Sequence, residues 1–348
     1  MSGPMTGPRI LFVVDAGPTV GGGHVMRSLT LAQALEAKGA ATAFVGPPPV
    51  GELLDAFAPD AVRMPAEDLA AAAVRESFDA IVFDHYGLAE PDHRAMAQGR
   101  PVLVIDDLAD RPLGADIVVD SGPARRPEDY LGLVALSAQL LLGPAYAPVR
   151  PEFAALRQTA LGWRGEPVQR ILVAMGLTDV GGITARIVER VRPRVNDLGI
   201  DIVLGAAAPS ADALARIARR DRRLTVHVDT PHMARLTAEA DIGIGAPGSS
   251  TWERCTLGLP SLLVALADNQ RPAARAMAER NAALVVDIAD PDFDAAFDRA
   301  LLRLLRDADL RRRLAAESAD VCDGLGAGRT AEAFLGLIAA RAGRSAAS

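Results

Sequence analysis

Short runs of almost entirely apolar residues alternate with longer, helix-like segments along this chain of 348 residues, and the alternation occurs twice in succession. Runs that are apolar on both faces are typical of strands in a parallel sheet that helices cover on each side. The expected strands are Ile10–Val14, Ala41–Val45, Ala80–Phe83, Val102–Ile105 and Ile117–Val119, then Ile171–Met175, Ile202–Leu204, Leu224–Val228, Ile242–Ile244, Leu262–Ala265 and Leu284–Val286. The pattern predicts an α/β fold of two Rossmann-like domains whose parallel sheets face an interdomain cleft.

A stretch rich in proline and glycine separates the two series. It predicts an interdomain connection with a short helix over Glu152–Thr159. Other helices are expected over Val25–Ala37, Phe293–Arg306 and Thr330–Ala340, with a frayed tail after them. The expected division is a catalytic domain at 8–145, the connection at 146–167, a ligand-binding domain at 168–325 and a final helix and tail at 326–348.

The composition excludes several kinds of chemistry. Lys38 is the only lysine, at an expected helix end, which argues against a Schiff base or a Walker-type phosphate loop. Cys255 and Cys322 cannot form a zinc site alone, and two cysteines are typical of a reducing compartment. A net charge of −7 argues against a nucleic-acid partner, and no apolar run predicts a membrane span or a signal peptide. We therefore expect a cytoplasmic protein without a metal or cofactor.

A glycine-rich turn follows the first expected strand, from Asp15 to His24. Such a strand-to-helix turn, which contains Gly22 and Gly23, lets the backbone approach a ligand closely, and the helix that follows favours an anion. The same end of the helix disfavours an imidazolium, so we expect a neutral His24 that can accept a proton, with Asp15 orienting it or polarising a water. Arg27 adds a cation. The alternative is a simple tight turn with an exposed histidine and a surface arginine.

Polar residues also follow two further strands of the first half. Asp84, His85 and Tyr86 come after one strand, and Asp106 and Asp107 come after the next. Open α/β sheets bind their ligands at these strand ends, so the aspartates are candidates for hydrogen bonds to a sugar. Each of them can equally cap a neighbouring segment.

In the second half, two loops have the composition of phosphate-binding turns. Met175–Gly182 follows one expected strand, and Gly245–Glu253 follows another with glycines and hydroxyl side chains. The spacing from Ser250 to Glu253 also fits a capping box, which is the structural alternative for Glu253.

A dinucleotide motif is the main competing interpretation of the second half. Gly243, Gly245 and Gly248 fit G-x-G-x-x-G, and Asp268 follows at a suitable distance. Gly243 lies inside the expected strand, however, and Pro247 interrupts the turn, so the match is weak. The remaining histidines, His93, His227 and His232, have no metal-ligand spacing and are expected at the surface or at strand ends.

Together the motifs resemble a bacterial family of nucleotide-sugar hydrolases of pseudaminic acid biosynthesis, which has the GT-B fold. The resemblance rests on segments that follow the family's order, namely Gly21–Arg27 (GGGHVMR), Val82–Leu88 (VFDHYGL), Ile105–Pro112 (IDDLADRP), Leu142–Arg157 (LGPAYAPVRPEFAALR), Gly245–Pro260 (GAPGSSTWERCTLGLP) and Leu266–Gln270 (LADNQ).

The resemblance implies inverting hydrolysis of a UDP-linked 2,4-diacetamido-2,4,6-trideoxyhexose to UDP and free sugar, without a metal. It makes His24 the base that activates water and Asp15 its assistant. The sugar would contact the first domain and the connection at Gly22, Gly23, Arg27, Asp84, His85, Tyr86, Asp106, Asp107 and Arg150. UDP would contact the second domain at Met175, Gly176, Thr178, Asp179, Gly248, Ser249, Ser250, Glu253 and Asn269, with Glu253 holding the ribose hydroxyls.

The chain departs from the family's pattern at three turns, namely Gly17-Pro18, Ser121-Gly122 and Gly176-Leu177. Since these turns lie where the sugar and the diphosphate would bind, the identity of the sugar stays open. Two other functions also stay open. One is an inverting UDP-sugar glycosyltransferase of the same fold, and the other is a non-catalytic protein that binds a nucleotide sugar or NAD. A two-domain chain of this size can act as a monomer.

Overall fold

The computed structural model describes residues 7–17, 20–65, 78–164 and 167–347. The chain divides into two compact units, of which the first comprises Met1–Pro148 and Leu325–Ser348 and the second comprises Val149–Gly324. Pro18, part of one departure noted above, lies outside the described residues. No helix within the described ranges is long and apolar enough to cross a membrane.

The first unit is built on a sheet with the strand order β2-β1-β3-β4-β5-β6, in which every pair is parallel. Its elements are β1 (Arg9–Val14), α1 (Gly23–Glu36), β2 (Ala41–Val45), α2 (Pro48–Phe57), β3 (Ala80–Asp84), α4 (Glu90–Ala97), β4 (Val102–Ile105), β5 (Ile117–Asp120), β6 (Gln139–Leu142) and α13 (Gly326–Ala347), with 3-10 turns η1 (Pro127–Tyr130) and η2 (Pro144–Tyr146).

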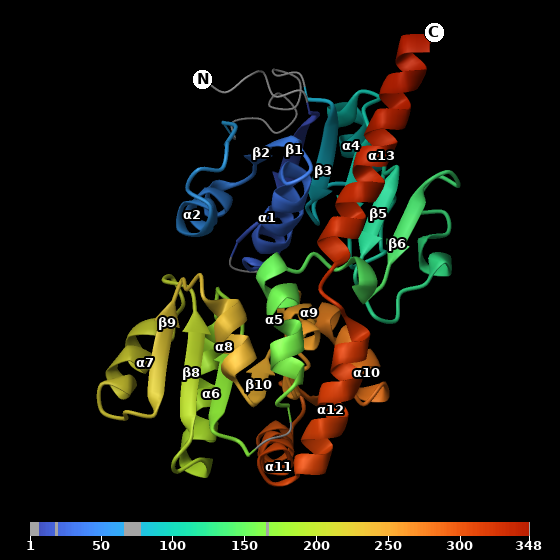
Figure 1. The fold of residues 1–348 in the computed structure, drawn as a ribbon. Helices are drawn as coiled ribbons and strands as arrows, with labels where there is room; N and C mark the ends of the chain where they lie inside the picture. The colour runs from blue at the N-terminus through green and yellow to red at the C-terminus, as the bar shows by residue number, and fades with distance from the viewer. Residues whose placement is uncertain (1–6, 18–19, 66–77, 165–166, 348) are drawn as a thin grey trace. The chain divides into compact units, whose positions relative to one another are not determined.

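Two apolar clusters fill the faces of this sheet because its strands are apolar at successive positions. Ile10 and Phe12 belong to one cluster, whereas Leu11 and Val13 belong to the other. The long final helix α13, red in Figure 1, packs against α1 and contributes Phe334 to the first cluster. The C-terminal segment of the chain is therefore part of the first unit's core.

The second unit has a parallel sheet of the order β12-β11-β10-β7-β8-β9. Its elements are α5 (Pro151–Leu161), β7 (Arg170–Ala174), α6 (Ile183–Val191), β8 (Gly199–Leu204), α7 (Ala211–Ala218), β9 (Leu224–Val228), α8 (Met233–Glu239), β10 (Ile242–Gly245), α9 (Ser250–Thr256), β11 (Ser261–Ala265), α10 (Arg271–Glu279), β12 (Leu284–Asp287), α11 (Phe293–Arg306) and α12 (Ala308–Val321), with 3-10 turns η3 (Val180–Gly182), η4 (Arg192–Arg194) and η5 (Asp268–Gln270). The predicted α/β class with two parallel sheets is confirmed.

Two elements were not predicted, and one prediction is corrected. The segment Gln139–Leu142, for which no strand was predicted, pairs with β5 as an edge strand, and its short apolar run gave too little periodicity to identify it. No helix was predicted over Ala308–Val321, yet α12 forms there, and the side chain of Asp307 caps it by accepting the N–H of Leu310. The residues expected to fray continue α13 as far as Ala347.

The order of strands identifies one reversal point in each sheet. In the first unit the strand after β1 lies on one side of the β1–β3 pair and the strand after β3 lies on the other side. In the second unit the strands after β7 and β10 lie on opposite sides of the β7–β10 pair in the same way. Loops that follow the strands at such a point separate from each other and leave room for a ligand. The glycine-rich turn and the loop that begins at His85 lie at the first point, and the two predicted phosphate loops lie at the second.

Candidate active site

A histidine and an aspartate form a buried pair at the reversal point of the first sheet. His24 lies in the first turn of α1 and Asp84 is the last residue of β3, and both side chains are buried. Nδ1 of His24 lies 2.8 Å from Oδ1 of Asp84. The ring of Tyr86 meets the imidazole edge-on, with the ring centroids 4.4 Å apart. The imidazole is therefore fixed in orientation from two sides.

Arg27 joins this pair to the next strand end. Its Nε and Nη2 donate to the two carboxylate oxygens of Asp84 at 2.8 and 2.6 Å, and its Nη1 donates to Asp107 at 3.0 Å. Burial alone would raise the pKa of Asp84, but the charges of Arg27 and His24 outweigh it and hold that pKa well below its usual range. Asp84 is therefore ionised. Arg27, which the sequence suggests as a cation for a substrate, has these donors occupied by aspartates.

Asp107 also accepts a hydrogen bond from Tyr86. The Tyr86 hydroxyl lies 2.6 Å from Oδ1 of Asp107, and burial together with the Asp107 charge raises the pKa of Tyr86. About a third of the Asp107 side chain is exposed, whereas Asp84 is fully buried. Of the aspartates in this network, Asp107 is therefore the one placed to reach a ligand.

The ends of β4 and β5 carry a second set of buried carboxylates. The Tyr130 hydroxyl lies 2.9 Å from Asp106 and 2.8 Å from Asp120. Arg111 Nη1 donates to Asp106 at 3.1 Å, and Arg125 Nε donates to Asp120 at 2.5 Å. Asp106, a candidate for sugar binding in the sequence, therefore serves to join neighbouring strand ends. The turn Ser121-Gly122 folds back onto the same network, since Gly122 N donates to Asp120.

His85 is held in a defined tautomer. Its Nδ1 accepts the backbone N–H of Gly87 at 3.0 Å, so the proton of the neutral ring lies on Nε2. Burial lowers the pKa of His85, which favours the neutral ring. Asp15, the expected partner of His24, donates its backbone N–H to the Asp84 carbonyl at 3.0 Å, whereas the carboxylate beside His24 is that of Asp84. His85 is therefore placed as a hydrogen-bond donor and Asp84 as the residue that orients His24.

The glycine-rich turn is closed by its own backbone. Gly21 has φ +82° and donates its N–H to the Gly17 carbonyl at 2.8 Å, and Gly22 stands immediately before α1 without a side-chain cap. Gly23 begins the helix. The positive φ of Gly21 favours glycine there, and the turn brings the backbone of Gly22 and Gly23 next to His24.

In the second unit, the loops after β7 and β10 are adjacent because Ala174 and Gly245, at the strand ends, are partners in the sheet. Gly176 has φ +118°, a conformation that suits glycine. Leu177 does not have a positive φ, so its position does not require a second glycine. Met175 is buried beneath the loop, and Thr178 is partly exposed in it.

Asp179 has a structural role that the sequence did not reveal. Its carboxylate is buried and accepts the backbone N–H groups of Thr184 at 2.8 Å and Ser210 at 3.0 Å. These bonds fix the start of α6 and the segment before α7. Asp179 therefore shapes the loop through its side chain, and a ligand would meet the backbone around it.

Arg150 and Glu253 lie together within the second unit. Arg150 immediately precedes α5, stacks on Phe153 and donates from Nε and Nη2 to Oε1 of Glu253, at 2.9 and 2.8 Å. The capping-box alternative for Glu253 is not realised, because Ser249 occupies the cap position and has no side-chain cap bond. No residue in the described part of the chain donates to Oε2 of Glu253. That oxygen can therefore accept from a ligand.

Asn269 lies in η5 after β11 and is exposed. The loop that carries it is held by Gln270, whose side-chain oxygen accepts the N–H of Leu266 at 2.9 Å. Asp268, the acidic residue of the weak dinucleotide motif, is paired with Arg271. Its carboxylate is therefore engaged in an ion pair at the protein surface.

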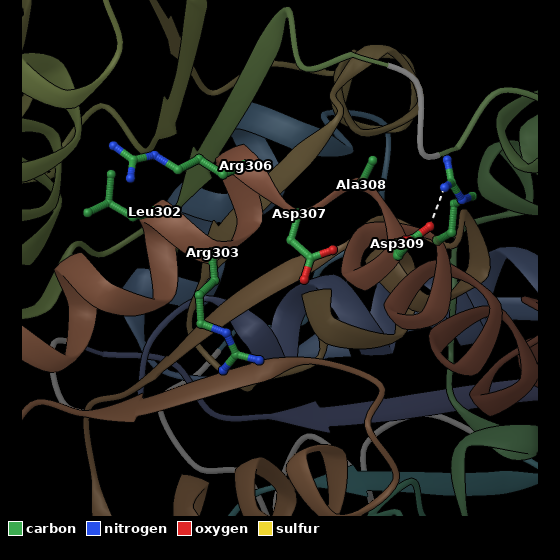
Figure 2. Close-up of a pocket in the computed structure, with 7 residues that line it drawn as sticks. Leu302, Arg303, Arg306, Asp307, Ala308 and Asp309 are labelled. Atoms are coloured by element: carbon green, nitrogen blue, oxygen red, sulfur yellow. Dashed lines mark hydrogen bonds and ion pairs between the residues drawn. The ribbon is translucent and has the colours of Figure 1, made fainter.

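A surface pocket lies where α11 meets α12 in the second unit. Figure 2 shows its lining residues, which are Leu302, Arg303, Arg306, Asp307, Ala308, Asp309 and Arg312. Asp309 is paired with Arg312, as the dashed line marks. An adjoining pocket reaches Val168 and Leu198, which stand just before β7 and β8. These pockets therefore lie at the amino ends of the strands, opposite the end at which open α/β sheets bind ligands.

Several residues of the network were not identified from the sequence. Tyr130 and Arg125 lie in or beside a 3-10 turn that no pattern predicted. His93, expected at the surface or at a strand end, is fully buried in α4, packs against the ring of Phe83 and accepts the Gly114 N–H through Nδ1. Helical spacing was the signal that could have identified His93 as buried, because it lies three residues before the apolar Met96 on the same side of α4.

The protein has the GT-B fold. A solved structure of Acinetobacter baumannii MurG matches with a TM-score of 0.65 over 94% of this chain and 99% of that one, at 17% identity. The spinosyn rhamnosyltransferase SpnG complexed with thymidine diphosphate matches with a TM-score of 0.59 over 93% of this chain and all of that one, at 15% identity. No protein-family profile matches the chain.

In sequence, the chain is similar to UDP-2,4-diacetamido-2,4,6-trideoxy-beta-L-altropyranose hydrolase of Campylobacter jejuni. The two are 25% identical over 277 residues, which is 78% of this chain and 97% of the relative. The resemblance inferred from the separate motifs thus extends over most of both chains.

Proposed function

We propose that this protein hydrolyses a UDP-linked 2,4-diacetamido-2,4,6-trideoxyhexose to UDP and free sugar, with inversion at the anomeric carbon, in the biosynthesis of pseudaminic acid or a related nonulosonate. The observation that carries the proposal is the buried pair of His24 and Asp84 at the reversal point of the first sheet. The similarity to the Campylobacter jejuni hydrolase supports the choice of substrate class.

The pair supports a general base because it fixes the tautomer of the imidazole. An ionised Asp84 has no proton to give, so at 2.8 Å the proton between the two groups belongs to Nδ1 of His24. The neutral ring then presents the lone pair of Nε2. A buried carboxylate that orients a histidine in this way also stabilises the imidazolium that forms when the ring accepts a proton.

In the proposed reaction, Nε2 of His24 removes a proton from water as the water oxygen bonds to the anomeric carbon. The bond from that carbon to the UDP oxygen breaks, and its electron pair leaves with the diphosphate. Attack on the face opposite the leaving group inverts the anomeric carbon. His85 and Asp107 are placed to bond the sugar's polar groups, His85 as a donor from Nε2 and Asp107 as an acceptor.

We propose that UDP binds to the second unit at the loops after β7 and β10. Gly176, Thr178, Gly248, Ser249 and Ser250 offer backbone N–H groups and hydroxyls to the diphosphate, which stabilises the charge that the leaving group gains. Oε2 of Glu253 would accept from the ribose hydroxyls while Arg150 holds Oε1. The exposed Asn269 would extend this site.

A glycosyltransferase is the second candidate, because the matching solved structures include the rhamnosyltransferase SpnG. The two functions differ in what attacks the anomeric carbon. A panel of UDP-diacetamido sugars, incubated with the protein in the absence of any acceptor, separates them. The proposal expects rapid release of UDP and a free sugar whose first-formed anomer, observed by NMR, is inverted. Release of UDP only after an acceptor is added would establish a transferase.

A further inference from the structure

The second unit contains a buried arginine that has no carboxylate partner in the described part of the chain. Arg254, in α9, is only 2% exposed. Its Nη2 donates to the Ala246 carbonyl at 2.8 Å and to the Thr251 hydroxyl at 3.1 Å, and its Nη1 donates to the Ser250 hydroxyl at 3.1 Å. Its Nε is buried without a hydrogen-bond partner. All the groups that receive its hydrogen bonds are neutral.

These contacts hold the loop that follows β10. Ala246 begins the loop, and Ser250 and Thr251 stand where the loop passes into α9. Because the Ser250 oxygen accepts from Arg254, its own hydroxyl proton is free to point elsewhere. The backbone N–H groups of Gly248 and Ser249 have no acceptor among the described residues. The loop therefore presents several donors that the protein itself does not use.

The sheet beneath Arg254 is shaped to receive it. A Cβ atom at Gly245 would lie 2.6 Å from Nη1 of Arg254 and 2.7 Å from the Ala174 carbonyl. A Cβ atom at Gly243 would lie 3.1 Å from Cδ of Arg254 and 2.8 Å from the Leu259 side chain. Two of the glycines in the apparent dinucleotide motif thus make room for an arginine side chain, which accounts for them without a dinucleotide.

The charge of Arg254 persists at neutral pH. Burial lowers its pKa to about 10, which still leaves the guanidinium protonated. The nearby charge of Glu253 offsets only part of this effect, and Glu253 forms no ion pair with Arg254 among the described residues. A buried charge without an ion-pair partner is unfavourable, and an anion that binds nearby relieves the cost. Since Arg254 is almost fully buried, it would act on such an anion through the loop rather than by contact.

We propose that Arg254 is a positioning residue for a diphosphate. Arg254 aligns the hydrogen-bond donors of the loop from Ala246 to Ser250, and the negative charge of the bound diphosphate balances the positive charge of Arg254. The proposal rests on the function proposed above, since the diphosphate is that of UDP. It adds a residue that touches no substrate and explains why the loop's hydroxyls and N–H groups face a ligand together.

The test compares UDP with uridine as ligands, because the two differ only in the diphosphate. In the Arg254→Met variant we expect the affinity for UDP, measured by calorimetry, to fall at least tenfold and the affinity for uridine to change less than threefold. In Arg254→Lys, which keeps the charge, we expect a smaller loss for UDP. Equal losses for UDP and uridine in Arg254→Met, or no loss for either, would overturn the proposal.

Arg164→Met is the matched control. Arg164 is also a largely buried arginine that donates to backbone carbonyls, those of Leu257 and Thr237 among them, but among the described residues it forms no hydrogen bond with the loop. We expect this variant to lose thermal stability and to keep the wild-type preference for UDP over uridine. A merely structural role for Arg254 would make the two variants behave alike.

A measurement on the wild type does not depend on the folding of any variant. Inorganic pyrophosphate alone, at millimolar concentration, should raise the Tm of the wild-type protein, and the absence of any rise would contradict the proposal. The outcomes also separate the two proposals. A pyrophosphate effect without hydrolysis of any UDP-sugar refutes the enzymatic function alone, whereas hydrolysis with an unchanged UDP preference in Arg254→Met refutes the role of Arg254 alone.

Discussion

Nδ1 of His24 lies 2.8 Å from Oδ1 of Asp84, and this contact connects residues at the ends of two strands that are not consecutive in the chain. His24 follows β1 and Asp84 ends β3, and these strands are neighbours at the point where the order of the sheet reverses. Arg27, one turn further along α1, binds both oxygens of the same carboxylate. The orientation of the imidazole therefore depends on a carboxylate that is itself held by an arginine.

Replacing Asp84 with asparagine should impair catalysis more than binding. The amide presents both an oxygen and an NH₂ group and no longer requires the proton to lie on Nδ1 of His24. We expect kcat to fall by about 10²–10⁴-fold, the typical value of a positioned general base. The affinity for UDP should stay within about threefold, since the loops of the second unit are unchanged. Steady-state kinetics and calorimetry measure both values.

Asp110→Asn is the control for that substitution. Asp110 is exposed, and its one ion pair with a described residue is with Arg111, outside the contact between His24 and Asp84. It should leave kcat within about twofold. Equal effects of the two substitutions would show that the orientation of His24 by Asp84 does not matter.

The buried His93 should make stability depend on pH. Burial, with the charge of Arg111, lowers its pKa to about 4, compared with ~6.5 in an unfolded chain. The unfolded state therefore binds more protons between these values, so stability is full above pH ~6.5 and falls as the pH decreases towards 4. For this residue alone, the free energy of unfolding should be about 2 kcal/mol lower at pH 5 than at pH 7.

Urea unfolding at both pH values, with the wild type and His93→Gln, checks this prediction. The substitution should reduce the difference between pH 7 and pH 5 by about that amount. His232→Gln, at an exposed position before α8, should leave the difference unchanged. An unaltered pH dependence in His93→Gln would mean that His93 is not the titrating group.

Glu253 should determine the recognition of ribose. If Oε2 accepts from the ribose hydroxyls, Glu253→Gln should weaken the binding of UDP by about tenfold, close to the lower value of one hydrogen bond to a charged group. The binding of 2′-deoxy-UDP should weaken less, so the preference for UDP over its deoxy analogue should decrease. Calorimetry with both nucleotides measures this preference. An unchanged preference would place the ribose elsewhere.

Gly245→Ala should destabilise the second unit. The added Cβ would meet Arg254 and the Ala174 carbonyl, and a backbone oxygen cannot move aside as a side chain can. We expect a loss of about 1–3 kcal/mol in the free energy of unfolding without ligand. Gly248→Ala is the matched substitution, because a Cβ there meets nothing within 4 Å. A loss of the same size at both positions would mean that the room for Arg254 is not the cause.

The sequence predicted the strand ends well and the side-chain partnerships poorly, and the reason is physical. Apolar runs and glycine turns are local patterns, so they locate β1, β3, β7 and β10 and the loops behind them. That Asp84 rather than Asp15 lies beside His24 depends on which strands are neighbours, which no local pattern records. The pairing of Arg150 with Glu253 is of the same kind, because 103 residues separate them.

Other features were missed because their signals were short or ambiguous. The edge strand β6 has only four residues, and its apolar run is too short to show a period. Arg254 resembles any surface arginine in sequence, and only the missing Cβ atoms of Gly243 and Gly245 indicate that it lies against the sheet. The same glycines suggested a dinucleotide motif, because glycine is required wherever another group approaches the backbone closely, whether that group is a ligand or an arginine side chain.

The role of His24 as the base is tested by His24→Gln in an assay of UDP release from a UDP-2,4-diacetamido sugar without an acceptor. The wild type should release UDP together with the inverted anomer. The variant should turn over about 10²–10⁴-fold more slowly while binding UDP with unchanged affinity. Turnover of the variant close to that of the wild type would contradict the assignment of His24 as the base, and a retained anomer from the wild type would contradict the mechanism.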